Sequence, residues 1–253
     1  MRIILSPAKK MVSDPDAPNP QGLPVFLHQT QRLLCRLQGM TPAELQALWM
    51  CNNRIAAQNV ERLRNMDLRR ALTPAVLAYD GIAFQRMAPQ VFTQQEEAYV
   101  AEHLRILSGF YGMLRPFDGV TPYRLEMQAR LSVDGAKDLY AFWSDALANQ
   151  LAGETDTIVN LASKEYARAV LPHLSDGMRV VTCAFCEMKG GKAVEKATLC
   201  KMARGEMVRF MAENRIARPE DLRAFDRYGF RYDREKSDEN TYVFIREGGK
   251  NHA

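Results

Sequence analysis

The sequence predicts a single α/β domain, with an α+β arrangement as the alternative. Short apolar runs typical of buried strands alternate with segments of helical period along all 253 residues. No internal repeat or long linker interrupts them, so residues 1–253 are expected to form one domain. A composition of 47% hydrophobic and 25% charged residues is typical of a globular protein and excludes general disorder.

The expected strands share short runs of large apolar or β-branched residues. They cover residues 2–5, 157–161, 179–183, 225–232 and 241–245.

The expected helices share apolar residues at helical spacing or a clear start signal. They cover residues 25–37, 41–50, 53–63, 93–107, 138–151, a segment that begins near 163, and 196–214. Capping boxes open two of them, at Thr41-Pro42-Ala43-Glu44 and Thr93-Gln94-Gln95-Glu96. The sequence around 189–192 indicates a hairpin or an open turn, because two glycines stand between two lysines.

Residues 104–116 contain a glycine bend between two apolar elements. Gly109 and Gly112 permit a tight reversal, which resembles the hairpin of a helix-hairpin-helix motif. In such a bend, unpaired backbone N–H groups hold a phosphate, and Arg115 would add a charge. The alternative is that Gly109 is an ordinary helix C-cap, which is the simpler interpretation of this segment alone.

The segment 122–127 alternates between apolar and charged residues. Alternation places Tyr123, Leu125 and Met127 on one side and Arg124 and Glu126 on the other. The two charged residues would either pair with each other on a solvated face or line a polar cleft.

Polar residues follow two of the expected strands. Ser6, Lys9 and Lys10 come after residues 2–5, and Ser163 and Lys164 come after residues 157–161. Ligands bind in α/β proteins at the carboxyl ends of strands, so these side chains are candidates for an anion site. Surface lysines and an N-capping serine are the alternative interpretation.

The net charge of +4 is mild, but its distribution is uneven. Residues 187–218 hold eight basic and four acidic residues. The expected helix over 196–214 would carry a basic stripe suited to a phosphate backbone. Its cations are Lys201, Arg204, Arg209 and Arg215.

The sequence indicates no metal site, no cofactor and no membrane partner. Cys183 and Cys186 form a single CxxC without a second half-site, so buried or semi-exposed thiols are expected. No apolar run approaches the ~18–20 residues that span a bilayer, and the start lacks a secretion signal. With five dispersed cysteines, a reducing cytoplasmic location is expected.

Six ordered motifs together resemble one family, the YaaA family of bacterial peroxide-stress proteins. They are Leu5-Ser6-Pro7-Ala8-Lys9, the stretch from Leu107 to Asp118, Pro122-Tyr123-Arg124-Leu125-Glu126-Met127, the stretch from Lys137 to Trp143, the stretch from Asn160 to Tyr166, and Lys201-Met202-Ala203-Arg204-Gly205. The resemblance runs from the first strand to the C-terminal strands.

The resemblance implies a single domain of unusual topology, called the cantaloupe fold, with a mixed sheet, a helix-hairpin-helix element and a basic cleft. It implies binding of duplex, bubble and junction DNA without sequence reading, in protection against hydrogen peroxide, in DNA repair and in lowering free iron. Self-association of copies along DNA is a further expectation. The candidate DNA-binding residues are Lys9, Gly109, Gly112, Arg115, Arg124, Lys164, Lys201 and Arg204.

An enzyme that acts on a nucleotide or a nucleic-acid base in the same cleft is the alternative function. Its candidate catalytic residues are Lys9, Tyr123, Arg124 and Glu126, with Ser6 beside them. A deep pocket with Lys9 and Glu126 within hydrogen-bond reach would favour the enzyme, and a shallow cleft would favour binding. Binding without catalysis is preferred, because the resemblance brings no established reaction.

Overall fold

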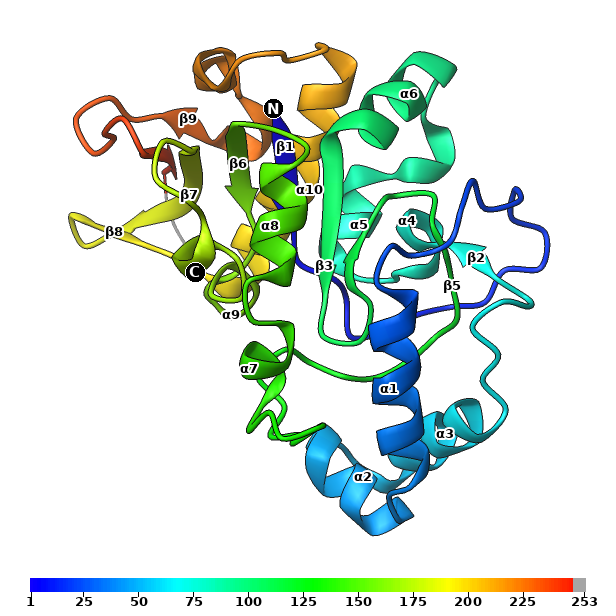
Figure 1. Ribbon diagram of the computed structural model, residues 1–253. Coiled ribbons are helices and arrows are strands. Elements are labelled where there is room, and N and C mark those ends of the chain that lie inside the picture. The colour runs from blue at the N-terminus through cyan, green and yellow to red at the C-terminus, as the bar shows by residue number, and fades with distance from the viewer. Residues whose placement is uncertain (248–253) are drawn as a thin grey trace, which may run out of the picture.

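An eight-stranded mixed sheet forms the centre of the computed structural model, which describes residues 1–247 (Figure 1). The order across it is β4 (Gly112–Leu114), β3 (Leu104–Ser108), β1 (Arg2–Leu5), β6 (Thr157–Leu161), β7 (Arg179–Lys189), β10 (Thr241–Arg246) and β9 (Arg231–Tyr232), and β8 (Lys192–Val194) pairs with β7. The five strands from β3 to β10 are parallel, while β4, β8 and β9 are antiparallel to their neighbours. The expected fold class and mixed sheet are confirmed.

The remaining elements surround this sheet. The helices are α1 (Leu27–Gln38), α2 (Pro42–Trp49), α3 (Asn53–Arg64), α4 (Ala75–Ala78), α5 (Ile82–Met87), α6 (Gln94–His103), α7 (Leu139–Trp143), α8 (Ala146–Ala152), α9 (Lys164–Ala167) and α10 (Ala197–Glu213). Short 3-10 turns are η1 (Pro89–Val91), η2 (Leu171–His173), η3 (Pro219–Ala224) and η4 (Arg227–Gly229), and β2 (Thr73–Pro74) pairs with β5 (Gly119–Val120). In Figure 1, α1, α2 and α3 lie together below the sheet.

Local sequence signals place most helix starts correctly. Both capping boxes form, with the hydroxyls of Thr41 and Thr93 accepting from the backbone of Glu44 and Glu96. The expected helix over 138–151 is instead two helices, because Ser144 adopts a positive φ of 45° between α7 and α8.

Two predicted elements are wrong. The helix that opens at Thr93 ends at His103, and the next five residues form β3, which pairs with β1. All five are buried, and burial on both faces is typical of a central parallel strand. In 225–232, only β9 is a strand, since η4 and the positive φ of Tyr228 interrupt the chain.

The crossing of α10 over α5 positions one wall of the functional site. α10 packs against α5, α6 and β7. At the crossing, a Cβ on Gly205 would lie 1.9 Å from the carbonyl oxygen of Ala83, so only glycine permits this approach. The low helix propensity of Gly205 is therefore offset by the close packing of α10 on α5. No helix among residues 1–247 has the length and apolarity to cross a bilayer.

Candidate functional site

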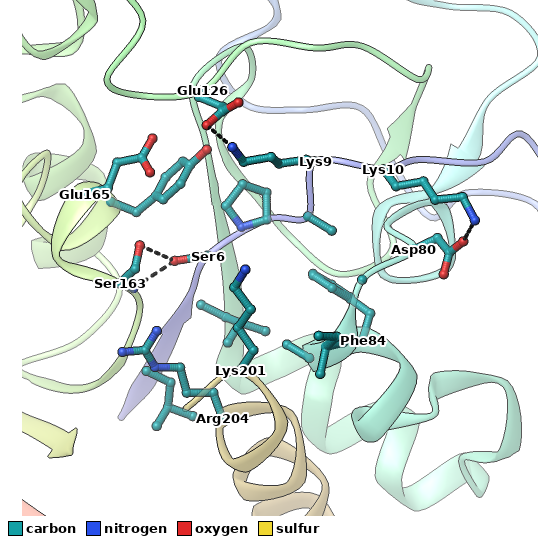
Figure 2. Close-up of a pocket in the computed structure, with 18 of the residues that line it drawn as sticks. Ser6, Lys9, Lys10, Asp80, Phe84, Glu126, Ser163, Glu165, Lys201 and Arg204 are labelled. Atoms are coloured by element: carbon teal, nitrogen blue, oxygen red, sulfur yellow. Dashed lines mark hydrogen bonds and ion pairs between the residues drawn. The ribbon is translucent and has the colours of Figure 1, made fainter. Parts of the chain in front are cut away.

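A cavity of about 350 Å³ opens at the carboxyl ends of β1 and β6 (Figure 2). Adjacent parallel strands in α/β proteins place ligands at this edge. Its walls come from the loop after β1, the start of α5, the segment 123–126, the start of α9 and the first turns of α10. The charged and hydroxyl-bearing side chains that line it are Ser6, Lys9, Lys10, Asp80, Tyr123, Arg124, Glu126, Ser163, Glu165, Tyr166, Lys201 and Arg204.

Two serines join the loop after β1 to the loop after β6. The Ser6 hydroxyl donates to the Ser163 hydroxyl at 3.1 Å and accepts the Ser163 backbone N–H at 2.8 Å. Ser163 occupies the N-cap position of α9, but its hydroxyl accepts no capping N–H. This link joins two loops that line the cavity. The prediction that Ser163 is an N-cap is correct for its position, but its side chain makes no capping hydrogen bond.

Lys9, Arg124 and Glu126 form a charged cluster on one wall. Lys9 Nζ lies 2.7 Å from Glu126 Oε2, and Arg124 Nη2 lies 3.5 Å from Glu126 Oε1. Arg124 also contacts the carbonyl oxygen of Trp49, while its Nε is buried without a partner. The expected alternation is confirmed in burial, since Tyr123, Leu125 and Met127 are buried.

Glu165 provides a second carboxylate in the cavity. Its Oε1 accepts the backbone N–H of Gln128 at 3.2 Å. Burial, with a smaller contribution from the charge of Glu126, raises the pKa of Glu165. The cavity therefore holds two carboxylates in different surroundings, since Glu126 has Lys9 and Arg124 as cationic partners and Glu165 accepts a backbone N–H.

A chain of hydroxyls fixes the back wall. The Tyr123 hydroxyl lies 2.9 Å from that of Tyr79 and 2.6 Å from that of Ser108. Burial raises the pKa of Tyr123, so its phenol stays neutral. Tyr123 therefore lines the cavity and does not act as a base.

Lys201 and Arg204 project from α10 into the opposite side of the cavity (Figure 2). No ion pair within residues 1–247 neutralises either cation, and Arg204 Nε is buried without a partner. Burial lowers the pKa of Arg204. A guanidinium left without an acceptor is suited to an anionic ligand.

The glycine bend is not part of this site, and the helix-hairpin-helix interpretation is wrong for it. β3 and β4 form a buried β-hairpin in which Phe110 and Tyr111 donate their backbone N–H groups to the Ser108 hydroxyl. A Cβ on Gly109 would lie 2.7 Å from a backbone oxygen of Leu125. Gly112 needs its glycine because its φ is +72° and Trp143 packs on it. No free amide of this bend faces solvent, so it offers no phosphate clamp.

Arg115 and Lys164 also lie outside the cavity. Arg115 follows β4 at the amino end of the parallel strands, near Arg105. Its backbone N–H donates to the Asp118 carboxylate. Lys164 lines a neighbouring hollow that shares Arg204 with the cavity.

The basic stripe on α10 is not continuous. Arg209 pairs with Glu213 at 2.7 Å, and Arg215 hydrogen-bonds Gln95. α10 is largely buried against α5 and α6, so only its first turns expose cations to the cavity.

The CxxC contains two buried free thiols. Burial raises the pKa of Cys183 to about 12, which keeps its thiol protonated and unreactive. Within residues 1–247, no three His, Cys, Asp or Glu side chains gather in a way that would hold a metal ion.

A family model described as peroxide stress protein YaaA matches residues 1–236. The chain belongs to the YaaA family of peroxide stress proteins. A UPF0246 protein from Agathobacter rectalis is 52% identical over 246 residues, covering 97% of this chain and 99% of the relative. UPF0246 proteins from Lachnoclostridium phytofermentans and Lactiplantibacillus plantarum are 50% and 49% identical over 97% of this chain. The family links the chain to peroxide stress.

In this YaaA-family chain, the cavity brings together four of the candidate DNA-binding cations, which are Lys9, Arg124, Lys201 and Arg204. Sequence reasoning assigned no role to Glu165, although it lies in the same post-strand motif as Ser163. It also missed the wall from Asp80 to Phe84, whose mixed composition carries no pattern that marks a site.

Proposed function

We propose that this protein binds DNA without reading its sequence during peroxide stress, and that the cavity receives one unpaired nucleotide. The convergence of Lys9, Arg124, Lys201 and Arg204 on one cavity carries this proposal. Lys201 and Arg204, which lack carboxylate partners within residues 1–247, would contact backbone phosphate, and the strong attraction of phosphates for such cations supplies affinity.

The dimensions of the cavity favour an extruded base over an intact duplex. About 350 Å³ suits a small organic ligand, whereas a duplex is far too wide to enter. Apolar side chains of Pro7, Ile82 and Phe84 line the same space and offer a surface for a base. Bubble DNA, whose bases are already unpaired, should therefore bind more tightly than duplex.

A salt titration with fluorescent duplex, bubble and four-way-junction DNA tests the proposal. Binding should weaken steeply with salt on all three, and bubble DNA should bind best. Lys201→Glu with Arg204→Glu should lower affinity on every DNA by about tenfold or more, because two phosphate contacts become repulsive.

The matched control is Arg54→Glu with Arg64→Glu on α3, which changes net charge equally at exposed positions outside the cavity. An equal loss of affinity from both double variants would mean that general charge, and not the cavity, attracts DNA. Full affinity of the Lys201 and Arg204 variant would contradict the proposal directly.

An enzyme acting on a nucleotide or a base is the second candidate. The 2.7 Å contact between Lys9 and the largely buried carboxylate of Glu126 in the cavity favours it. Incubating nucleotides and bubble DNA with the protein, followed by mass spectrometry, would show a product that Glu126→Gln fails to make. Unchanged substrates after long incubation would leave binding as the function.

A further inference from the structure

A second hollow of about 400 Å³ lies beside the cavity, and Arg204 lines both. The segment 160–168 separates them, since alternate residues face opposite sides. Leu161 and Ser163 line the cavity, whereas Ala162 and Lys164 line the hollow. Arg204 is therefore positioned at the junction between two ligand-sized spaces.

Arg204 has the properties of an anchor for a group shared between these spaces. Its Nε is buried without a partner, and no carboxylate pairs with its guanidinium among residues 1–247. A buried donor without an acceptor is unfavourable unless a ligand supplies one. Lys201 stands on the cavity side and Lys164 on the hollow side, so positive charge flanks the junction from both directions.

The hollow has the mixed lining that a nucleoside requires. Leu171 and Pro172 supply apolar surface, and Glu195 supplies a carboxylate acceptor. Asn160 also lines the hollow, but it is buried, donates to the Thr182 hydroxyl at 3.2 Å and accepts the backbone N–H of Ala162, so its amide is already satisfied. The lining therefore offers an apolar face for packing and the Glu195 carboxylate for a base edge.

We propose that the cavity and the hollow hold two consecutive nucleotides of an unpaired DNA strand, with the phosphodiester between them on Arg204. The inference rests on the proposed function and deepens it, because it names a dinucleotide step as the unit that the site recognises. The planar guanidinium presents paired N–H donors that match the two free oxygens of a phosphodiester.

Calorimetry with thymidylyl-thymidine, its uncharged methylphosphonate analogue and thymidine 5′-monophosphate tests the inference. The charged dinucleotide should bind wild-type protein about tenfold more tightly than the methylphosphonate, as expected for a lost charge-assisted contact. It should also bind more tightly than thymidine 5′-monophosphate, which keeps a charged phosphate but fills only one of the two spaces. Arg204→Gln should bring the charged and uncharged dinucleotides within about twofold of each other. The control Arg115→Gln, at the opposite end of the sheet, should keep the full ratio.

Equal binding of the charged and uncharged dinucleotides to wild-type protein would overturn the inference without any variant. A ratio preserved in a folded Arg204→Gln protein would also overturn it. Bubble DNA that binds while no dinucleotide does would reject the two-site step and leave the proposed function standing, whereas a protein that binds no DNA would fail at the proposed function itself. Tighter binding of uridylyl-uridine would overturn the assignment to DNA.

Discussion

An arginine lies at each end of the parallel sheet, and the two differ in how their guanidinium groups are hydrogen-bonded. At the amino end, Arg105 is 4% exposed and donates from all three guanidinium nitrogens to Glu154 and to backbone carbonyls. Glu154 also accepts from Arg2 and Gln150. At the carboxyl end, Arg204 has a buried Nε without a partner and borders a cavity.

The contrast separates a structural arginine from a binding one. A guanidinium whose donors are all satisfied within the protein has no donor left for a ligand. A guanidinium with an unsatisfied donor can still donate to one. Net charge or burial alone does not make this distinction. Three experiments would break or sharpen it.

The largest expected effect is the loss of stability on Glu154→Ala. The substitution leaves Arg105 as an uncompensated buried charge, which lowers the free energy of unfolding by about 3–5 kcal/mol. Urea denaturation measures it. Arg204→Gln should change the same quantity by less than about 1 kcal/mol, because it breaks no internal pair. A loss for Arg204→Gln as large as that for Glu154→Ala would erase the distinction.

A pH effect of intermediate size should come from Asp118, which also lies near Arg105. Burial raises the pKa of Asp118 to about 6 from 3.8, so the folded state binds a proton that the unfolded state releases between these values. The stabilisation is complete below about pH 4 and is lost as pH rises through about 6.

Asp118→Asn removes this titration and keeps an acceptor for the Arg115 N–H. Its free energy of unfolding should therefore rise relative to wild type by about 3 kcal/mol between pH 4 and pH 7. Urea denaturation at several pH values measures the difference. A constant difference across this range would show that Asp118 does not titrate in the window.

The smallest expected effect is that of Lys201→Gln on DNA binding. One phosphate contact should be lost, so the slope of log K against log salt should fall by about 1. Fluorescence anisotropy at several salt concentrations measures it. An unchanged slope would place Lys201 outside the contact surface and leave Arg204 as the anchor.

Local signals account for what the sequence predicted correctly. β1, both capping boxes and the polar residues after β1 and β6 follow from short-range chemistry. The cavity itself depends on which distant segments meet, as when Glu126 reaches Lys9. The helical prediction is wrong for Leu104 to Leu107, because only pairing with β1 selects the strand there.

The same limit explains the glycine bend and Glu165. Two glycines near an arginine are compatible with an open loop, and only the packing of Leu125 and Trp143 reveals that the turn is covered. Glu165 gains its altered proton affinity from burial, which a linear sequence does not display.

The contact between Gly205 and Ala83 has a consequence for how relatives of this protein diversify. Main-chain atoms set the spacing there, so the width of the gap between α5 and α10 is a fixed dimension. Substituting the side chains around this gap would change which ligand the cavity prefers, while the distance between the two helices stays constant. New specificities should arise in this architecture by substitution of the side chains that line the cavity. A wider gap between α5 and α10 would require a different helix crossing.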